Sequence, residues 1–134
     1  MKNILIVEDQ IAMKYPADYS KLAEGIAEFV VLKSFNSAMR YIRQNKDNID
    51  GIILDLGFAN FDCDFSTYDE KKGIELLREM KRCKVKIPNL LIFSTTELDA
   101  IDYHMLDGLG VSLFEVKFMK NFDENSFLDF IKNC

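Results

Sequence analysis

Five short runs of β-type residues alternate along this sequence with five longer stretches of helical spacing. Each run is rich in Ile, Val, Leu or Phe, and three of them are nearly continuous in hydrophobicity. Helices cover strands of that kind on both faces, as in parallel sheets built from βα units with right-handed crossovers. The sequence therefore predicts an α/β fold: a doubly wound, five-stranded parallel sheet, (βα)5, in a flavodoxin-like three-layer sandwich. The expected strands are NILIVE (3–8), FVVLKS (29–34), GIILDL (51–56), NLLIFST (89–95) and SLFEVK (112–117).

The stretches between these runs carry apolar residues three or four positions apart, the spacing of one helix face. Asn36 or Ser37 is expected to cap the second helix, and Gly108 or Gly110 is expected to stop the fourth. No repeat, low-complexity tract or linker interrupts the pattern. The expected helices span residues 17–29, 36–46, 69–82, 96–110 and 123–133.

Length and composition limit the classes of protein to which the chain can belong. Its 134 residues suit one domain, 1–134. No apolar run approaches the roughly 18 residues of a membrane span, and MKNILIVEDQ lacks the features of a signal peptide, so we expect a cytoplasmic protein without membrane contact. A net charge of -5 disfavours direct binding to nucleic acid. Cys63, Cys83 and Cys134 are odd in number and lack CxxC spacing, which favours free thiols.

Polar side chains follow four of the five expected strands. In a doubly wound sheet, ligands bind outside the carboxyl ends of the strands, so these side chains are expected to converge on one edge. A single acid after a strand is often a helix N-cap, and each residue alone is weak evidence. The combination at four strand ends is what indicates a site. Its members are Glu8 and Asp9, Asp55, the hydroxyls of residues 94–96, and Lys117.

Three clustered carboxylates repel one another, and a divalent cation relieves that repulsion. Ligands that are all oxygen favour a hard ion, which in a cell is Mg²⁺. A carboxylate beside Mg²⁺ is a suitable nucleophile toward a phosphoryl group, with an ammonium and a hydroxyl placed to bind the phosphoryl oxygens. The pattern therefore favours phosphoryl transfer onto Asp55.

At these residues the chain resembles a response regulator receiver domain (CheY-like) of two-component signalling over essentially its whole length. The resemblance implies that Glu8 and Asp9 hold Mg²⁺ together with Asp55 and the backbone carbonyl of Gly57. It also implies that Asp55 accepts phosphate from a histidine kinase or phosphotransfer protein, and that Lys117 pairs with Asp55 or its phosphate. The motifs that carry it are ILIVEDQ, IDGIILDL, LLIFST and GVSLFEVK.

The hydroxyl and the switch residue follow from the same resemblance. Ser94 directly ends the apolar run LLIF, whereas Thr95 has the separation from the lysine that is usual in the family. Both stay candidates, and Ser94 is preferred. Phe114, three residues before the lysine, matches the aromatic switch position of the family.

Two departures from the family pattern concern loops. Lys117 is followed by Phe118 where the family usually has a proline, so a cis peptide is not expected there. The segment 57–70 after the acceptor is about ten residues longer than usual, and such loops are usually functional or disordered. Its aromatics are expected to cap the acidic pocket, to form a docking face, or to pack locally beneath the loop. They are Phe58, Phe61, Phe65 and Tyr68.

The leading hypothesis is a signalling receiver, with no enzymatic activity beyond self-catalysed phosphoryl transfer and autodephosphorylation. Phosphorylation is expected to remodel the face formed by 96–110, 112–117 and 123–133, where a downstream partner or a second copy binds. The alternative is a receiver-like protein-binding module that is no longer phosphorylated. A haloacid-dehalogenase-like phosphatase is rejected because Leu56 and Gly57 follow Asp55 instead of a second acid. A flavodoxin-type FMN protein is rejected because EDQIAMKY lacks a phosphate-binding pattern.

Overall fold

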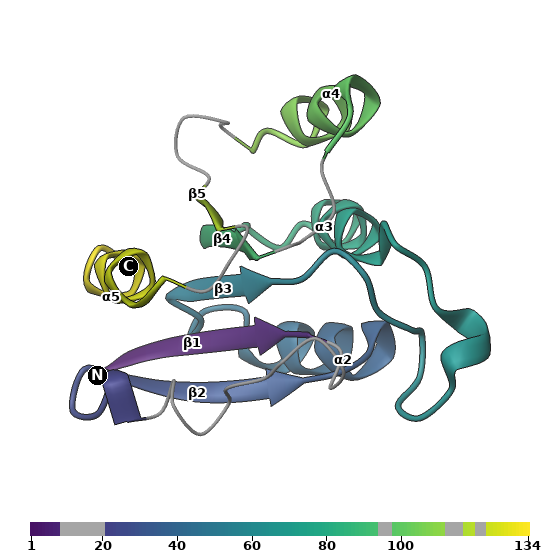
Figure 1. The fold of residues 1–134 in the computed structure, drawn as a ribbon. Helices are drawn as coiled ribbons and strands as arrows, with labels where there is room; N and C mark the ends of the chain where they lie inside the picture. Colours follow the sequence, from purple (N-terminus) through teal and green to yellow (C-terminus); the bar gives the residue numbers. More distant parts are fainter. Residues whose placement is uncertain (9–20, 94–97, 112–116, 120–122) are drawn as a thin grey trace.

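The computed structural model describes residues 1–8, 21–93, 98–111, 117–119 and 123–134 (Figure 1). Its strands are β1 (Lys2–Val7), β2 (Ala27–Leu32), β3 (Gly51–Leu54), β4 (Asn89–Phe93) and β5 (Lys117–Met119). Its helices are α2 (Phe35–Asn45), the 3-10 helix η1 (Phe65–Thr67), α3 (Lys72–Arg82), α4 (Ala100–Gly108) and α5 (Glu124–Lys132). Among the helices of these ranges, none has the length and apolar character needed to cross a bilayer.

The described strands form one parallel sheet in the order β2-β1-β3-β4-β5. This is a doubly wound order, in which the direction of winding reverses between β1 and β3. Val7, the last residue of β1, pairs with Leu32 of β2 and with Leu54 of β3. The three strands therefore end level with one another. The predicted α/β fold with a parallel, flavodoxin-like sheet is confirmed.

Alternate residues of the central strands contribute to two hydrophobic clusters, one on each face of the sheet. In β1, Leu5 and Val7 pack with residues of α2 and α3, whereas Ile4 and Ile6 pack with residues of α5. None of these four side chains is more than 2% exposed. Figure 1 shows α2 and α3 near each other and α5 well apart from them. Burial on both faces explains why the strands are continuously apolar, as the sequence predicted.

Strand β2 begins two residues earlier than predicted, because the preceding helical stretch ends sooner. Gly25 has a φ of +78°, in the left-handed region that favours glycine. The backbone N–H of Ala27 donates to the carbonyl of Ala23 (3.1 Å), which closes a turn. Ala27 then already pairs with Lys2 of β1. The helix expected over 17–29 therefore does not extend to its predicted end, and its first four residues lie outside the described residues.

The helix ends also differ in detail from the sequence prediction. Helix α2 is capped by Ser34 and not by Asn36 or Ser37, because the Ser34 hydroxyl oxygen accepts the backbone N–H of Ser37 (3.3 Å). Helix α4 runs through Gly108, and the glycine that ends it is Gly110, whose φ is +75°. Which of several neighbouring residues caps or ends a helix depends on backbone conformation, which the sequence does not show.

The described part of strand β5, Lys117–Met119, continues past Lys117, where the sequence predicted the strand to end. Leu91 of β4 pairs with Lys117, and Phe93 pairs with Met119. Phe118 has the backbone N–H that a proline would lack, so the chain can continue the ladder past the lysine. Residues 112–116, the rest of the predicted strand, lie outside the described residues. No cis peptide bond occurs in the part of the chain that the structure describes.

Candidate functional site

The described part of the candidate site lies where β1 and β3 end, at the reversal of the strand order. Glu8 follows β1 directly and Asp55 follows β3 directly. The backbone N–H of Glu8 donates to the carbonyl of Leu32 (2.9 Å), and that of Asp55 donates to the carbonyl of Val7 (2.9 Å). These bonds extend the sheet by one residue, so the two acids leave adjacent strands at the same level. The structure thus brings Glu8 and Asp55 to the edge where such sheets bind ligands.

Both carboxylates are withdrawn from solvent, to different degrees. Glu8 is 2% exposed, and Asp55 is half-buried. One carboxylate oxygen of Asp55, Oδ1, accepts the backbone N–H of Leu56 (2.7 Å) and that of Gly57 (3.4 Å). These two donors orient the Asp55 carboxylate from within its own loop. Asp55 is therefore a positioned carboxylate, and not a freely rotating surface acid.

Gly73 positions the backbone of Asp55 from the first turn of α3. Its N–H donates to the carbonyl of Leu56 (2.8 Å). A Cβ atom at position 73 would lie 2.6 Å from the carbonyl oxygen of Asp55 and 3.0 Å from the Cα of Leu56. Because real Cβ contacts are not this short, only glycine allows α3 to pack so closely on the acceptor loop. Sequence reasoning did not single out this residue.

The remaining predicted site residues are only partly described. Lys117 pairs with Leu91, which pairs with Ile53, so Lys117 is level with the residue two positions before Asp55. At the usual strand rise this is about 7 Å along the strand axis. The predicted position of Lys117 at the end of its strand is therefore wrong, and its proposed contact with Asp55 stays a prediction. The other predicted residues, Asp9, Ser94, Thr95 and Phe114, lie outside the described residues.

The described donors suit a hard divalent cation. Carboxylate oxygens and a backbone carbonyl are the ligands that Mg²⁺ takes, and Glu8, Asp55 and Gly57 supply these types at one sheet edge. Burial of Glu8 disfavours its charged form, and a cation bound at this edge would compensate that cost. Within the described ranges, no three side chains of His, Cys, Asp or Glu are grouped to hold a metal. The third predicted carboxylate, Asp9, falls outside those ranges.

The long segment 57–70 after the acceptor is attached to the rest of the domain at several points. Phe58 and Asp69 exchange two backbone hydrogen bonds, of 3.3 and 3.2 Å. The backbone N–H of Phe35, at the start of α2, donates to the carbonyl of Ala59 (2.9 Å). Figure 1 shows the segment as an excursion between β3 and α3. Backbone hydrogen bonds therefore fix both ends of this segment.

The aromatic residues of this excursion have different surroundings. Phe58 is fully buried in the cluster beneath α2 and α3, which confirms local packing for this residue. Phe61 is 54% exposed, and Tyr68 is 48% exposed. The hydroxyl of Tyr68 nevertheless lies against Gly57, two residues after Asp55. The description of Phe65 covers only its backbone.

Where the excursion meets α3, Lys71 forms an ion pair with Asp102 of α4. Asp102 is 5% exposed, and its carboxylate also accepts the backbone N–H of Asp99 (3.0 Å) in a capping box. Burial raises the pKa of Asp102, but the hydrogen bonds from Lys71 and from the Asp99 backbone outweigh it and hold that pKa below its usual range. Sequence reasoning missed this link between α3 and α4. The capping box alone has a sequence signal, which is two acids three positions apart.

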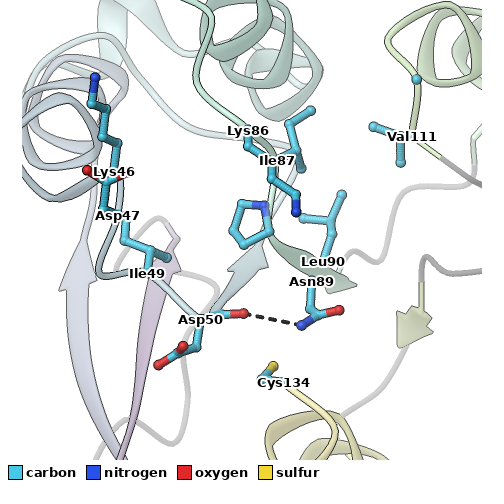
Figure 2. Close-up of a pocket in the computed structure, with 12 residues that line it drawn as sticks. Lys46, Asp47, Ile49, Asp50, Lys86, Ile87, Asn89, Leu90, Val111 and Cys134 are labelled. Atoms are coloured by element: carbon cyan, nitrogen blue, oxygen red, sulfur yellow. Dashed lines mark hydrogen bonds between the residues drawn. The ribbon is translucent and has the colours of Figure 1, made fainter.

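A pocket of about 570 Å³ lies at the opposite edge of the sheet, near the starts of β3 and β4 (Figure 2). Asp50 and Asn89 line it, and the Asn89 side-chain amide donates to the Asp50 carbonyl (3.3 Å). Cys134 also lines it, and burial raises the pKa of its thiol to about 11. None of the predicted site residues lines this pocket, so it is separate from the acids at the carboxyl edge.

No family model matches the sequence, and no curated protein matches it. Solved structures match over nearly the whole chain. A CheY-like response regulator receiver domain protein from Methanospirillum hungatei JF-1 is 16% identical with a TM-score of 0.69, over 99% of this chain and 92% of that one. A response regulator receiver domain protein from Clostridium thermocellum is 20% identical, with a TM-score of 0.66 over 99% and 93%. The Mn(2+)-bound form of response regulator Rcp1 is 20% identical, with a TM-score of 0.64 over 99% and 91%. This chain therefore has the CheY-like fold of response regulator receiver domains.

Proposed function

We propose that this chain is a phosphoacceptor receiver that takes a phosphoryl group on Asp55 from a histidine kinase or phosphotransfer protein. The observation that carries the proposal is the position of Asp55 beside the buried Glu8, at the reversal point of a receiver-type sheet. Its chemistry is limited to accepting the group and losing it by hydrolysis. A cytoplasmic location is part of the same proposal.

In the proposed reaction, a carboxylate oxygen of Asp55 attacks the phosphorus of the donor. The bond between phosphorus and the donor histidine nitrogen breaks, and its electron pair stays on the imidazole. The backbone donors at Leu56 and Gly57 hold the Asp55 carboxylate, which restricts the directions from which it can attack. Gly73 holds the same loop from the side of α3.

Glu8, Asp9, Asp55 and the carbonyl of Gly57 are the residues that we propose to hold Mg²⁺. When bound, the cation would supply positive charge that stabilises the phosphoryl oxygens in the transition state. The similarity of the fold to the Mn(2+)-bound form of response regulator Rcp1 supports the binding of a divalent cation. Ser94, with Thr95 as the alternative, and Lys117 are proposed to bind the transferred oxygens.

The decisive experiment is incubation with acetyl phosphate and Mg²⁺, followed by intact-protein mass spectrometry. The parent is expected to gain one phosphoryl group, and Asp55→Asn is expected to gain none. Asp62→Asn and Asp64→Asn, which alter acids of the nearby excursion, serve as matched controls and are expected to label like the parent. Labelling of Asp55→Asn would overturn the acceptor assignment. A parent that no phosphodonor labels would leave the protein-binding module as the function.

The lysine assignment needs a separate comparison because the register places Lys117 level with Ile53, two positions before Asp55. Lys117→Met is expected to slow phosphorylation of Asp55 or to weaken the conformational change that follows it. Lys120→Met, at the next lysine in the sequence, is the matched control. An effect of Lys120→Met with none of Lys117→Met would transfer the role to Lys120.

The response to phosphorylation is proposed to reach partners through α4, β5 and α5. On α4, Ile101 is 69% exposed and Tyr103 is 41% exposed. Exposed apolar residues on one helix are suited to contact a downstream protein or a second copy of the chain. Phe114 is the proposed switch residue at this face.

A further inference from the structure

The contact between Gly57 and Tyr68 is unusually close for residues eleven positions apart. A Cβ atom at position 57 would lie 2.2 Å from the hydroxyl oxygen of Tyr68 and 2.9 Å from its Cζ. Gly57 does not have a positive φ, so its backbone conformation does not by itself require glycine. The reason for glycine here is space. The end of the Tyr68 side chain occupies the volume in which a side chain at position 57 would begin.

Tyr68 is held in this position by pairing on both sides of it. The preceding residue, Thr67, accepts the backbone N–H of Asn60 at its hydroxyl oxygen (2.9 Å). The following residue, Asp69, exchanges two backbone hydrogen bonds with Phe58. Phe58 is itself fully buried, which anchors this end of the excursion in the core. The excursion therefore delivers Tyr68 to the residue two positions after Asp55 through a fixed backbone.

We infer that Tyr68 is a positioning residue that covers the Asp55 side of the site and sets how long the phosphoryl group persists. The inference rests on the proposed function. Hydrolysis requires a water oxygen to attack phosphorus while the bond from phosphorus to the Asp55 oxygen breaks. The electron pair of that bond returns to the Asp55 carboxylate, and the protons of the water end on inorganic phosphate and solvent. A phenol seated beside Gly57 reduces the space from which such a water can approach.

The inference also explains the length of the excursion. A side chain carried by residue 57 itself would be attached to the acceptor loop, and its size would be limited by that loop. A side chain delivered from residue 68 can be large without altering the backbone that carries Asp55. The excursion therefore places a bulky aromatic group beside the acceptor and leaves Gly57 free of a Cβ.

The kinetic test loads the parent and its variants with acetyl phosphate and Mg²⁺, removes the donor, and follows loss of the phosphoryl group by intact mass. Tyr68→Ala is expected to speed this loss by about fivefold or more, equivalent to a barrier lower by about 1 kcal/mol. Tyr68→Phe, which keeps the ring, is expected to stay within about twofold of the parent. Phe61→Ala is the matched control, because Phe61 is an exposed aromatic of the same excursion that the structure does not place at Gly57.

A thermal cycle tests the geometry without any phosphoryl transfer. Gly57→Ala is expected to displace the Tyr68 side chain, because the new Cβ meets the Tyr68 hydroxyl, and to lower the melting temperature of the parent by up to about 4 °C. In the Tyr68→Ala background, the same change is expected to cost much less. Equal losses in both backgrounds would show that Tyr68 does not occupy this space, and would overturn the inference.

The kinetic outcomes separate the two proposals. A parent that labels, together with Tyr68→Ala that loses phosphate at the parental rate, would overturn the role of Tyr68 and leave the receiver function standing. An equal acceleration by Phe61→Ala would assign the effect to the excursion as a whole, and would also overturn the specific role of Tyr68. A parent that never labels would overturn the proposed function and this inference together.

Discussion

Replacement of Gly73 by alanine tests whether α3 positions the acceptor loop. The new Cβ would lie 2.6 Å from the carbonyl oxygen of Asp55, whereas ordinary contacts begin near 3.4 Å. Either α3 or the acceptor loop must therefore move by about 0.8 Å. Overpacking of this kind costs about 1–3 kcal/mol. Alanine in a helix returns up to about 1 kcal/mol relative to glycine, so we expect a net loss of stability of about 1 kcal/mol.

Gly108→Ala is the matched control, because Gly108 is also helical and a Cβ atom there would meet nothing within 4 Å. It should gain stability by up to about 1 kcal/mol from helix propensity alone. The propensity terms largely cancel between the two variants, so the difference between them isolates the contact with Asp55. We expect that difference to be about 1–3 kcal/mol, or roughly 4 °C per kcal/mol in a domain of this size.

Urea unfolding followed by far-UV circular dichroism measures both variants under the same conditions. Since displacement of a reacting group by about 1 Å can cost up to about a hundredfold in rate, Gly73→Ala is also expected to slow labelling of Asp55 by about tenfold. Gly108→Ala is expected to label normally. The reasoning is refuted if Gly73→Ala stabilises the protein as much as Gly108→Ala does.

Three further changes have expected outcomes. Ser34→Ala removes the N-cap of α2 and should lower the free energy of unfolding by about 1 kcal/mol in urea titrations; no loss would show that the cap is dispensable. Because the folded-state pKa of Asp102 is lowered from its ordinary value, its pairing with Lys71 contributes stability that is present above the ordinary pKa and is lost as the pH falls through the lowered one. Asp102→Asn should therefore flatten the acid limb of the stability profile, and an unchanged limb would contradict the linkage. At pH 8, iodoacetamide should modify the exposed Cys63 well before Cys134, whose buried thiol has its pKa raised to about 11; peptide mapping that finds the reverse order would contradict the burial.

The sequence by itself was sufficient for the fold class and for part of the site. Continuous apolar runs predict strands that are buried on both faces, and Ile4 and Leu5 confirm this by packing on opposite sides of the sheet. An acid directly after such a run is carried to the carboxyl edge, because a parallel sheet aligns its strand ends. Glu8 and Asp55 follow from that rule alone. Both features depend on local pattern, which a single sequence displays.

Only the tertiary structure decided where elements begin and which distant residues meet. The position of Lys117 along β5 depends on the register of that strand against β4, and the cap of α2 depends on backbone conformation at Ser34. The pair of Lys71 with Asp102, and the seat of Tyr68 on Gly57, join residues that no periodicity relates. Such contacts are set by how packed elements approach one another in space. The local patterns from which strands and helices are predicted therefore carry no information about these contacts.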